Sequence, residues 1–331
     1  MTSSFPVALF MSSSKYRVVI VSISRMYKRT GKNFSSMGCL LISPHGTPSI
    51  KDLVITRSPF WYQSRTSLAV SNNIVIPFLH IDMPRQANPL HEVEARVRKL
   101  PVDAPYKASF QPITRTNLKF LAVRMPDLNR LVRDGFSFYD KTDKEILEIW
   151  NQIWNHTKLH DVMSLPLIYY RWKSSTLTQK HFRIFRGWME RIENWAHADQ
   201  LCQLVSILYE QHGTLIEPIL QQWNRSTNPW KRRASVVSTI YYASPRRSPP
   251  SRRVVLSLIE PLLQDKDLYV QKGVGWQLRE AHKLWPRETL TFLESHVLEL
   301  PAITFSYATE KLSPTDKKRL KQKRAHHRTL A

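Results

Sequence analysis

The sequence predicts an all-α body built as an α-solenoid, a superhelix of stacked antiparallel helix pairs. From about residue 88 onward, apolar residues recur at three- and four-residue spacing, and no stretch alternates convincingly with period two. The expected helices are short and recur in pairs about every 35–40 residues, which is typical of HEAT-like repeats. Such pairs stack into a curved array with a concave face. A compact helical bundle is the competing architecture.

Composition indicates the kind of partner. The chain has 331 residues, of which 42% are apolar, so it can bury a sizeable core. Its net charge of +23 favours a polyanion, with nucleic acid first and an anionic membrane surface second. Two cysteines, Cys39 and Cys202, cannot build a disulfide framework or a four-cysteine metal cluster. No apolar run is long enough to span a bilayer.

The first part of the chain differs from the rest. Residues 1–81 are Ser-rich, contain nine Lys and Arg but only one acid, and lack sustained helical or strand periodicity. Targeting segments have this composition. The alternative is a leader that never folds, with the true start downstream, for example at Met83. We therefore expect residues 1–85 to be a disordered or targeting-like leader and residues 86–312 to be the helical domain. Residues 313–331 are expected to be a basic tail, which could be a nuclear signal, a DNA clamp or disordered.

Helix-start signals mark several elements of the body. Thr142-Asp143-Lys144-Glu145 and Thr214-Leu215-Ile216-Glu217 are both capping-box patterns. Asn228 is expected to cap a further helix, with Pro229 at its first position. The remaining helices are expected at roughly 127–134, 162–172, 178–195, 199–211, 252–264, 267–284, 286–297 and 303–311.

Three tryptophan-containing segments in the second half of the chain carry the chemistry. Trp195 and Asp199 stand four apart, so on one continuous helix they share a face. Trp276 follows the two glycines of Gly273-Val274-Gly275. Because glycine weakens a helix, their presence indicates that the helix backbone lies close to another group at this point. The alternatives are that both tryptophans belong to the core, that Asp199 is solvated, and that the glycines serve helix packing.

Cationic residues cluster after Trp230, the tryptophan of the remaining segment. Lys231, Arg232 and Arg233 follow it at the start of the helix capped by Asn228, where free backbone amides favour anions. Residues 225–253 hold eight Lys and Arg and no acid, and residues 245–253 form a basic segment expected to contact phosphate. A simply solvated basic face is the alternative. Together these segments indicate a cationic groove lined by aromatic faces and one carboxylate.

Other kinds of site lack their parts. The sequence has no Gly-x-x-x-x-Gly-Lys-Ser/Thr phosphate cradle, no His-Glu-x-x-His or Cys-x-x-Cys metal pattern, and no Gly-x-Ser-x-Gly. We therefore expect no metal and no cofactor.

The ordered motifs of residues 121–312 resemble the AlkD-like DNA alkylation repair glycosylases, a family built from HEAT-like repeats. Val123-Arg124-Met125-Pro126-Asp127-Leu128 is similar to the entry helix of that family. The family patterns Trp-x-x-x-Asp and Asn-x-Trp-x-x-Arg recur here, the first ending at Asp199 and the second at Arg233. The longest match runs from Asp267 through Lys272 into Gly275-Trp276-Gln277-Leu278-Arg279-Glu280.

The resemblance implies a metal-independent hydrolase of N-glycosyl bonds that removes alkylated purines, chiefly 3-methyladenine and 7-methylguanine, from double-stranded DNA. Trp195 and Trp276 would flank the deoxyribose, Asp199 would face its anomeric carbon, and Arg233 would hold a backbone phosphate. Further DNA contacts are expected from the neighbouring groove residues Trp230, Lys231, Arg232, Tyr269, Lys272 and Arg279.

The chain departs from the family pattern at His197 and Ala198, where bulkier or acidic residues are common, and this leaves the lesion range open. The alternative function is a non-catalytic α-solenoid that binds nucleic acid or protein. We expect a monomer with no membrane partner, in a DNA-containing compartment: the nucleus or an organelle of a eukaryote, or the cytoplasm of a bacterium.

Overall fold

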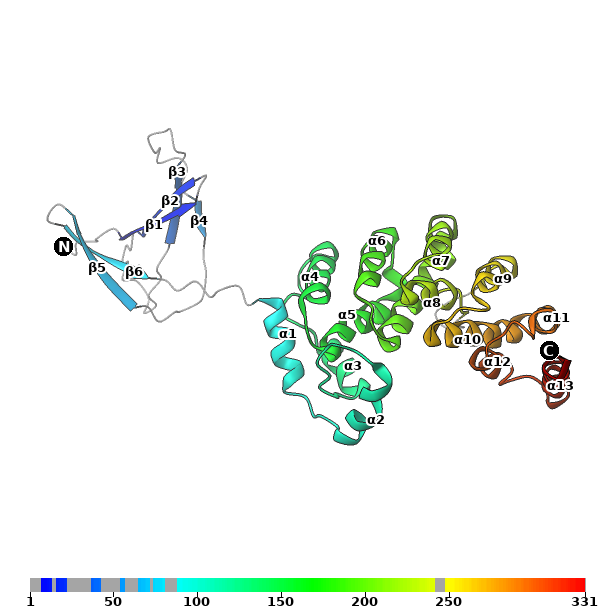
Figure 1. Ribbon diagram of the computed structural model, residues 1–331. Coiled ribbons are helices and arrows are strands. Elements are labelled where there is room, and N and C mark those ends of the chain that lie inside the picture. Colours follow the sequence, from blue (N-terminus) through cyan, green and yellow to red (C-terminus); the bar gives the residue numbers. More distant parts are fainter. Residues whose placement is uncertain are drawn as a thin grey trace, which may run out of the picture. The chain divides into compact units, whose positions relative to one another are not determined.

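The computed structural model describes residues 88–241 and 248–326 with their side chains. It also gives the backbone of strands between residues 7 and 80 and of residues 327–330 at the end of the last helix. By its internal packing the chain divides into two units, Met1–Gln86 and Ala87–Ala331, and each unit is described separately (Figure 1).

The first unit contains short antiparallel strands. They are β1 (Val7–Ser13), β2 (Tyr16–Ser22), β3 (Met37–Ile42), β4 (Val54–Thr56), β5 (Arg65–Ser71) and β6 (Ile74–His80). One sheet has the order β1-β2-β3-β4, and β5 pairs with β6 separately. Residues 1–81 therefore form strands although their sequence lacks sustained period-two alternation. Strands such as β2 contain continuous β-branched runs rather than alternating patterns, so a period-two test misses them. The targeting role of residues 1–85 stays a prediction.

The second unit is all-α, as predicted. Its helices are α1 (Pro89–Arg98), α2 (Ala104–Thr114), α3 (Met125–Asp134), α4 (Asp143–His156), α5 (His160–Trp172), α6 (Gln179–Trp188), α7 (Trp195–Asn224), α8 (Pro229–Val237), α9 (Arg252–Ile259), α10 (Leu268–Leu284), α11 (Pro286–His296), α12 (Ala302–Ala308) and α13 (Pro314–Leu330). Short 3-10 turns lie at Ser174–Thr176, Met189–Arg191 and Glu260–Leu262.

These helices stack in succession, as an α-solenoid requires. In one row, α3, α5, α7, α8, α10 and α12 each pack against the next helix named (Figure 1). A continuous hydrophobic core runs along the stack from Val93 in α1 to Leu320 in α13. Because each helix contacts its neighbours rather than one shared centre, the solenoid prediction is confirmed and the compact-bundle alternative is wrong. The row from α7 to α12 carries the site described below.

Several helix boundaries differ from expectation. The first capping box is confirmed, since Thr142 and Glu145 exchange hydrogen bonds at the start of α4. The helix expected over 178–195 ends at Trp188, and Trp195 instead begins α7, which also contains Asp199. The backbone at His212 is non-helical (φ −134°, ψ 38°), so α7 consists of two helical segments joined at a kink. The second segment begins next to Thr214, where the second capping-box pattern predicted a helix start.

Two further observations concern predicted features of the chain. None of the helices in the described part is long and apolar enough to cross a membrane. In the basic segment 245–253, residues 245–247 lie outside the described residues, while Arg252 begins α9.

Candidate functional site

The helices that supply the predicted site residues each begin with a side-chain cap. Asn194 and Asn228 each accept one backbone N–H at 2.9 Å, at the starts of α7 and α8. Asp267 accepts two, at 2.8 and 3.1 Å, at the start of α10. Such caps satisfy amides that have no partner inside the helix. The starts of α7 and α10 are thereby fixed, which places Trp195 and Tyr269 in the first turns of their helices.

The predicted residues converge on one cavity of about 320 Å³ between α2, α7, α8, α10 and α12. Trp195, Asp199 and Trp276 all line it, although they are up to 81 positions apart in the sequence. The remaining lining residues are Ile113, Arg233, Tyr269, Lys272, Arg279 and Tyr307. The structure thus brings the three predicted catalytic side chains to one place, and their catalytic role stays a prediction.

The charged centre of the cavity is an ion pair between Asp199 and Arg233. Arg233 donates from Nε and Nη2 to the two carboxylate oxygens of Asp199, both at 2.9 Å, and from Nη1 to the Tyr269 carbonyl oxygen at 2.6 Å. The Arg233 side chain is 5% exposed and that of Asp199 is 21% exposed. The carboxylate therefore reaches the cavity while the guanidinium lies behind it.

This pairing keeps Asp199 ionised. Burial raises the pKa of the Asp199 carboxyl above its ordinary value, and the charge and hydrogen bonds of Arg233 offset part of that rise. Both carboxylate oxygens accept N–H groups, so a proton on either oxygen would face a donor. We therefore expect the carboxylate form at neutral pH, with the lone pairs that Arg233 does not use directed to the cavity.

The expected phosphate-binding role of Arg233 does not fit this geometry. Three of its N–H groups are donated within the protein, and the residue is only 4% exposed. A phosphate would have to displace Asp199 from a buried bidentate pair, which is costly. Arg233 is better described as the residue that orients Asp199.

The two glycines of α10 serve close packing, the alternative given above. A Cβ on Gly273 would lie 3.1 Å from Cγ and 3.2 Å from Nη1 of Arg233, so the glycine leaves room for that side chain. A Cβ on Gly275 would lie 2.6 Å from the Cβ of Tyr307 and 2.8 Å from the Thr304 carbonyl oxygen. The absence of a side chain at Gly275 lets α12 approach α10 and bring Tyr307 to the cavity.

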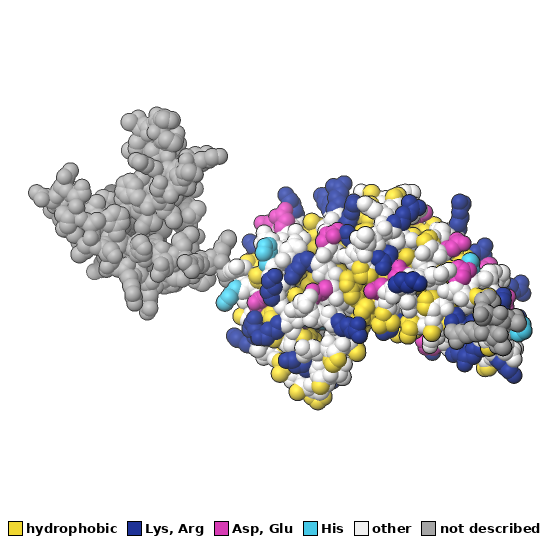
Figure 2. All heavy atoms as spheres, in the orientation of Figure 1, with side chains coloured by type: hydrophobic (Ala, Val, Ile, Leu, Met, Phe, Trp, Pro, Cys, Tyr) yellow, Lys and Arg dark blue, Asp and Glu magenta, His cyan; other side chains and the backbone are white. Residues whose placement is uncertain are grey.

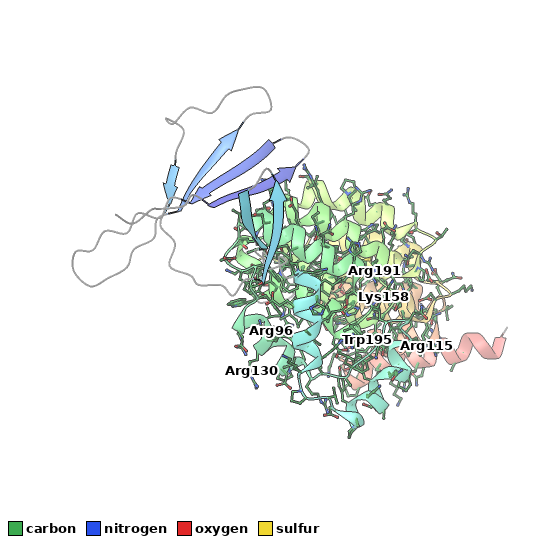
Figure 3. The ribbon with its side chains drawn as sticks, turned by 90° about the vertical axis from the view of Figure 1, so that its left-hand side faces the viewer. Arg96, Arg115, Arg130, Lys158, Arg191 and Trp195 are labelled. Carbon is green, nitrogen blue, oxygen red and sulfur yellow. The ribbon has the colours of Figure 1, made fainter. Side chains whose placement is uncertain are left out.

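One end of α2 contributes Ile113 to the cavity lining. The Ile113 carbonyl oxygen accepts hydrogen bonds from Trp195 Nε1 at 3.1 Å and from the Tyr269 hydroxyl at 3.0 Å. These bonds hold Trp195 and Tyr269 to the same atom. Figure 3 shows Trp195 with Arg115, two residues after Ile113, beside it in that view.

Ile113 and Tyr307 are the lining residues that the sequence interpretation missed. Ile113 lies in α2, a helix absent from the predicted set, and it precedes the first recognised motif. Tyr307 lies in a helix that was expected, but no motif marks it. The glycine at position 275 was the only available signal, because it indicated close approach without naming the partner.

Three predicted DNA-binding residues lie elsewhere. Arg232 donates to both carboxylate oxygens of Asp265, at 2.6 and 3.2 Å, and to two backbone carbonyl groups. Lys231 pairs with Glu190 at 2.7 Å on another face of α8. Trp230 packs its ring on Tyr269, 4.9 Å between centroids. Successive residues of a helix point in different directions, so only Arg233 of this run lines the cavity.

The other two predicted cations, Lys272 and Arg279, line the cavity, but only Arg279 is paired with acidic side chains of the described residues. Arg279 pairs with Glu280 at 3.2 Å and with Glu310. Lys272 has no acidic partner among the described residues, and its amino group lies 5.6 Å from the centroid of the Tyr269 ring. Lys272 is therefore the better placed of the two to meet an incoming anion.

His197 and Ala198, where the chain departs from the family pattern, are buried and do not line the cavity. Both residues are 0% exposed. The His197 ring contacts Asn194, Ser164 and the His160 carbonyl oxygen at 2.9 to 3.1 Å. This ring helps to fix the start of α7 and does not reach the cavity, so the departures change the support of Trp195 and leave the lining unchanged.

Metal ligation is not indicated in the described residues, which contain no group of three or more His, Cys, Asp or Glu that could hold an ion. The groups available for chemistry in the cavity are a carboxylate, indole and phenol rings, and cationic side chains.

Comparison with known protein families identifies one match. The family model described as DNA alkylation repair enzyme matches residues 101–312. No curated protein matches the chain. Among solved structures, a predicted DNA alkylation repair enzyme from Enterococcus faecalis is 13% identical, with a TM-score of 0.56 and coverage of 65% of this chain and 99% of that one. This likeness shows a shared fold.

Two other solved structures have lower TM-scores. AlkD2 from Streptococcus mutans is 17% identical, with a TM-score of 0.43 and coverage of 67% of this chain and 99% of that one. The alkylpurine DNA glycosylase AlkC from Pseudomonas fluorescens, bound to DNA containing an abasic site analog, is 15% identical, with a TM-score of 0.46. It covers 70% of this chain and 64% of that one.

Proposed function

The chain belongs to the DNA alkylation repair enzyme family, and from this we propose that it is a DNA glycosylase that excises cationic N-alkylated purines such as 3-methyladenine and 7-methylguanine. The observation that carries the proposal is the convergence of Trp195, Asp199 and Trp276 on one cavity. Its substrate is double-stranded DNA that contains such a base. The protein acts as a monomer in a compartment that holds DNA.

The chemistry of the lesion fits the side chains present. An N-alkylated purine carries a positive charge and is a good leaving group. In the proposed reaction the bond between C1′ and N9 breaks, and its electron pair stays with the purine, which becomes neutral. The positive charge moves to the sugar, which becomes oxocarbenium-like. Water then bonds to C1′ and loses a proton, leaving the free base and an abasic site.

The aromatic rings stabilise the charge that develops on the sugar. An indole face attracts a cation, and the attraction strengthens as water is excluded. Trp195 and Trp276 come from two different helices, α7 and α10, so they can contact the sugar from two directions. The Ile113 carbonyl oxygen, which accepts the Trp195 Nε1–H, fixes one of these rings before DNA arrives.

Asp199 supplies the negative charge. Arg233 uses one lone pair on each carboxylate oxygen, so each oxygen keeps another for a water molecule or for the electrostatic stabilisation of C1′. Because the pair is preorganised, Asp199 need not rearrange as the charge develops. In this proposal Asp199 also accepts the proton of the attacking water and passes it to solvent.

The test is release of 7-methylguanine from methylated duplex DNA by the purified full chain, with Asp199→Asn as the variant. Asparagine keeps the shape of the side chain and removes its charge. We expect wild-type protein to release the base and the variant to lose about 10²–10³-fold in single-turnover rate, the range seen when one electrostatic stabiliser is removed. Equal rates would remove Asp199 from its role.

A matched control separates chemistry from folding. Asp265 pairs with Arg232 as Asp199 pairs with Arg233, but it lies outside the cavity. Asp265→Asn should cost comparable thermal stability and leave the rate of base release near that of the wild type. If wild-type protein binds duplex DNA but releases no base, the non-catalytic solenoid becomes the better account.

A further inference from the structure

The last helix, α13, lies outside the part of the chain that matches the family. The match ends at residue 312, and α13 spans Pro314–Leu330. It follows directly after α12, the helix that brings Tyr307 to the cavity. This helix therefore lies beyond the matched part of the chain, and the proposed function does not account for it.

One face of α13 is docked on the end of the helical array. Leu320 is 1% exposed and belongs to the hydrophobic core. Arg324 donates from Nη1 to the carbonyl oxygens of Val297 and Leu300, both at 2.7 Å, and its guanidinium carbon lies 4.7 Å from the centroid of the Phe305 ring. Such contacts hold the orientation of the helix, so the rest of its surface is presented in a defined direction.

Lys317, Lys318 and Lys321 lie along one side of α13, where Lys318 and Lys321 are exposed and Lys317 is half-buried next to Leu320. Positions three and four apart are neighbours on a helix, so these side chains form one stripe. None of the three has an acidic partner among the described residues, and the nearby Asp316 is engaged by Arg319 at 3.0 Å. Like charges at this spacing weaken a helix, by a few tenths of a kcal/mol for each pair. A stripe that keeps three unpaired lysines is therefore suited to an anionic partner.

The composition of α13 favours one kind of anionic partner over another. In residues 314–326 the large apolar side chain is Leu320, and it is buried against the array. An interfacial membrane helix needs an exposed apolar face, which these residues do not have. Phosphates of a nucleic acid need only positive charge at suitable spacing. Figure 2 shows Lys and Arg side chains around the end of the array where α13 lies.

We infer that α13 is a second DNA contact, in which Lys317, Lys318 and Lys321 bind the phosphate backbone of the duplex arm beyond the cavity. The inference rests on the proposed function, which places the damaged base pair of the duplex at the cavity. Packed helices are about 8–10 Å apart, and a base pair rises about 3.4 Å, so α13 would reach phosphates roughly three or more base pairs from the lesion. The contact should therefore depend on duplex length.

The test measures binding of the full chain to duplexes of about 10 and about 25 base pairs, each with one abasic site, by fluorescence anisotropy over a range of salt concentrations. The variant is Lys317→Gln/Lys318→Gln/Lys321→Gln, which keeps good helix formers in place. On the long duplex the slope of log K against log salt should fall by about two to three units, since each lost phosphate contact removes about 0.9. Two short duplexes are compared, with the abasic site about two base pairs from one end or from the other end. On the one that lacks the arm facing α13, the two proteins should differ much less.

A charge-matched control is Lys141→Gln/Lys144→Gln/Lys180→Gln, which removes three exposed lysines at the starts of α4 and α6. An equal loss of slope in this control would show a general effect of net charge and overturn the inference. An unchanged slope in the α13 variant, with helicity preserved by circular dichroism, would overturn it as well.

The inference and the proposed function fail in different measurements. Base release from a short methylated duplex that lacks the arm facing α13 depends on the cavity and should be the same in the wild type and in the α13 variant. If the wild type releases no base, the glycosylase proposal fails while the length-dependent salt slope can still be measured. If base release occurs but the slopes agree, only the role of α13 fails.

Discussion

Replacing Arg233 with methionine should make Asp199 titrate at higher pH. In the structure Arg233 holds both oxygens of Asp199 at 2.9 Å, and this contact opposes the effect of burial on the pKa of the carboxyl. Methionine fills a similar volume without charge or N–H donors. In Arg233→Met, burial acts alone and disfavours the carboxylate form.

The size of the effect follows from the contact. An opposite charge at close range lowers the pKa of an aspartate by about 1–3 units, so its removal should raise the pKa of Asp199 by about that amount. Breaking a buried pair costs about 3–5 kcal/mol of stability. We expect the lower end, because the Asp199 side chain keeps 21% exposure to solvent. Protonation relieves this cost, so the folded variant should become more stable as pH falls through the raised pKa of Asp199.

The assay is the single-turnover rate of 7-methylguanine release from duplex DNA between pH 5 and pH 9. The acid limb of the profile should move up by about 1–3 pH units in Arg233→Met. Arg232→Met is the matched control, because it breaks the similar pair with Asp265 away from the cavity. An acid limb at the same pH in the wild type and in Arg233→Met would refute the assignment of Asp199 as the ionised group.

Two further predictions concern stability. Gly275→Ala should destabilise the fold by about 1–3 kcal/mol in thermal unfolding, since its Cβ would lie 2.6 Å from a side-chain atom of α12, whereas Gly187→Ala, with no atom within 4 Å, should be neutral or stabilising. Burial lowers the pKa of His160 from 6.5 to about 4. The unfolded chain then binds a proton that the folded chain does not, so stability should fall on acidification through this range by up to roughly 3 kcal/mol. The pH dependence measured by urea unfolding should be flatter in His160→Leu, and equal dependence would contradict this.

The sequence by itself determined the helical nature of the body and most of the cavity lining. Spacing of apolar residues and short paired helices predicted the stacked array, because each helix must bury one stripe against its neighbours. The motifs around Trp195, Asp199 and Trp276 identified side chains that do meet. The sequence missed the strands of the first unit and placed a helix end at Trp195, where α7 begins.

Only the tertiary structure decided which charged residues face the cavity and which are already paired. Lys231, Arg232 and Arg233 are adjacent in the sequence, yet they pair with Glu190, Asp265 and Asp199 in three directions. Acids distant in the sequence set these pairings, and local patterns carry no information about them. The sequence likewise does not show that the Ile113 carbonyl oxygen binds Trp195 and Tyr269, or that α13 docks through Arg324, because these contacts join residues far apart in the chain.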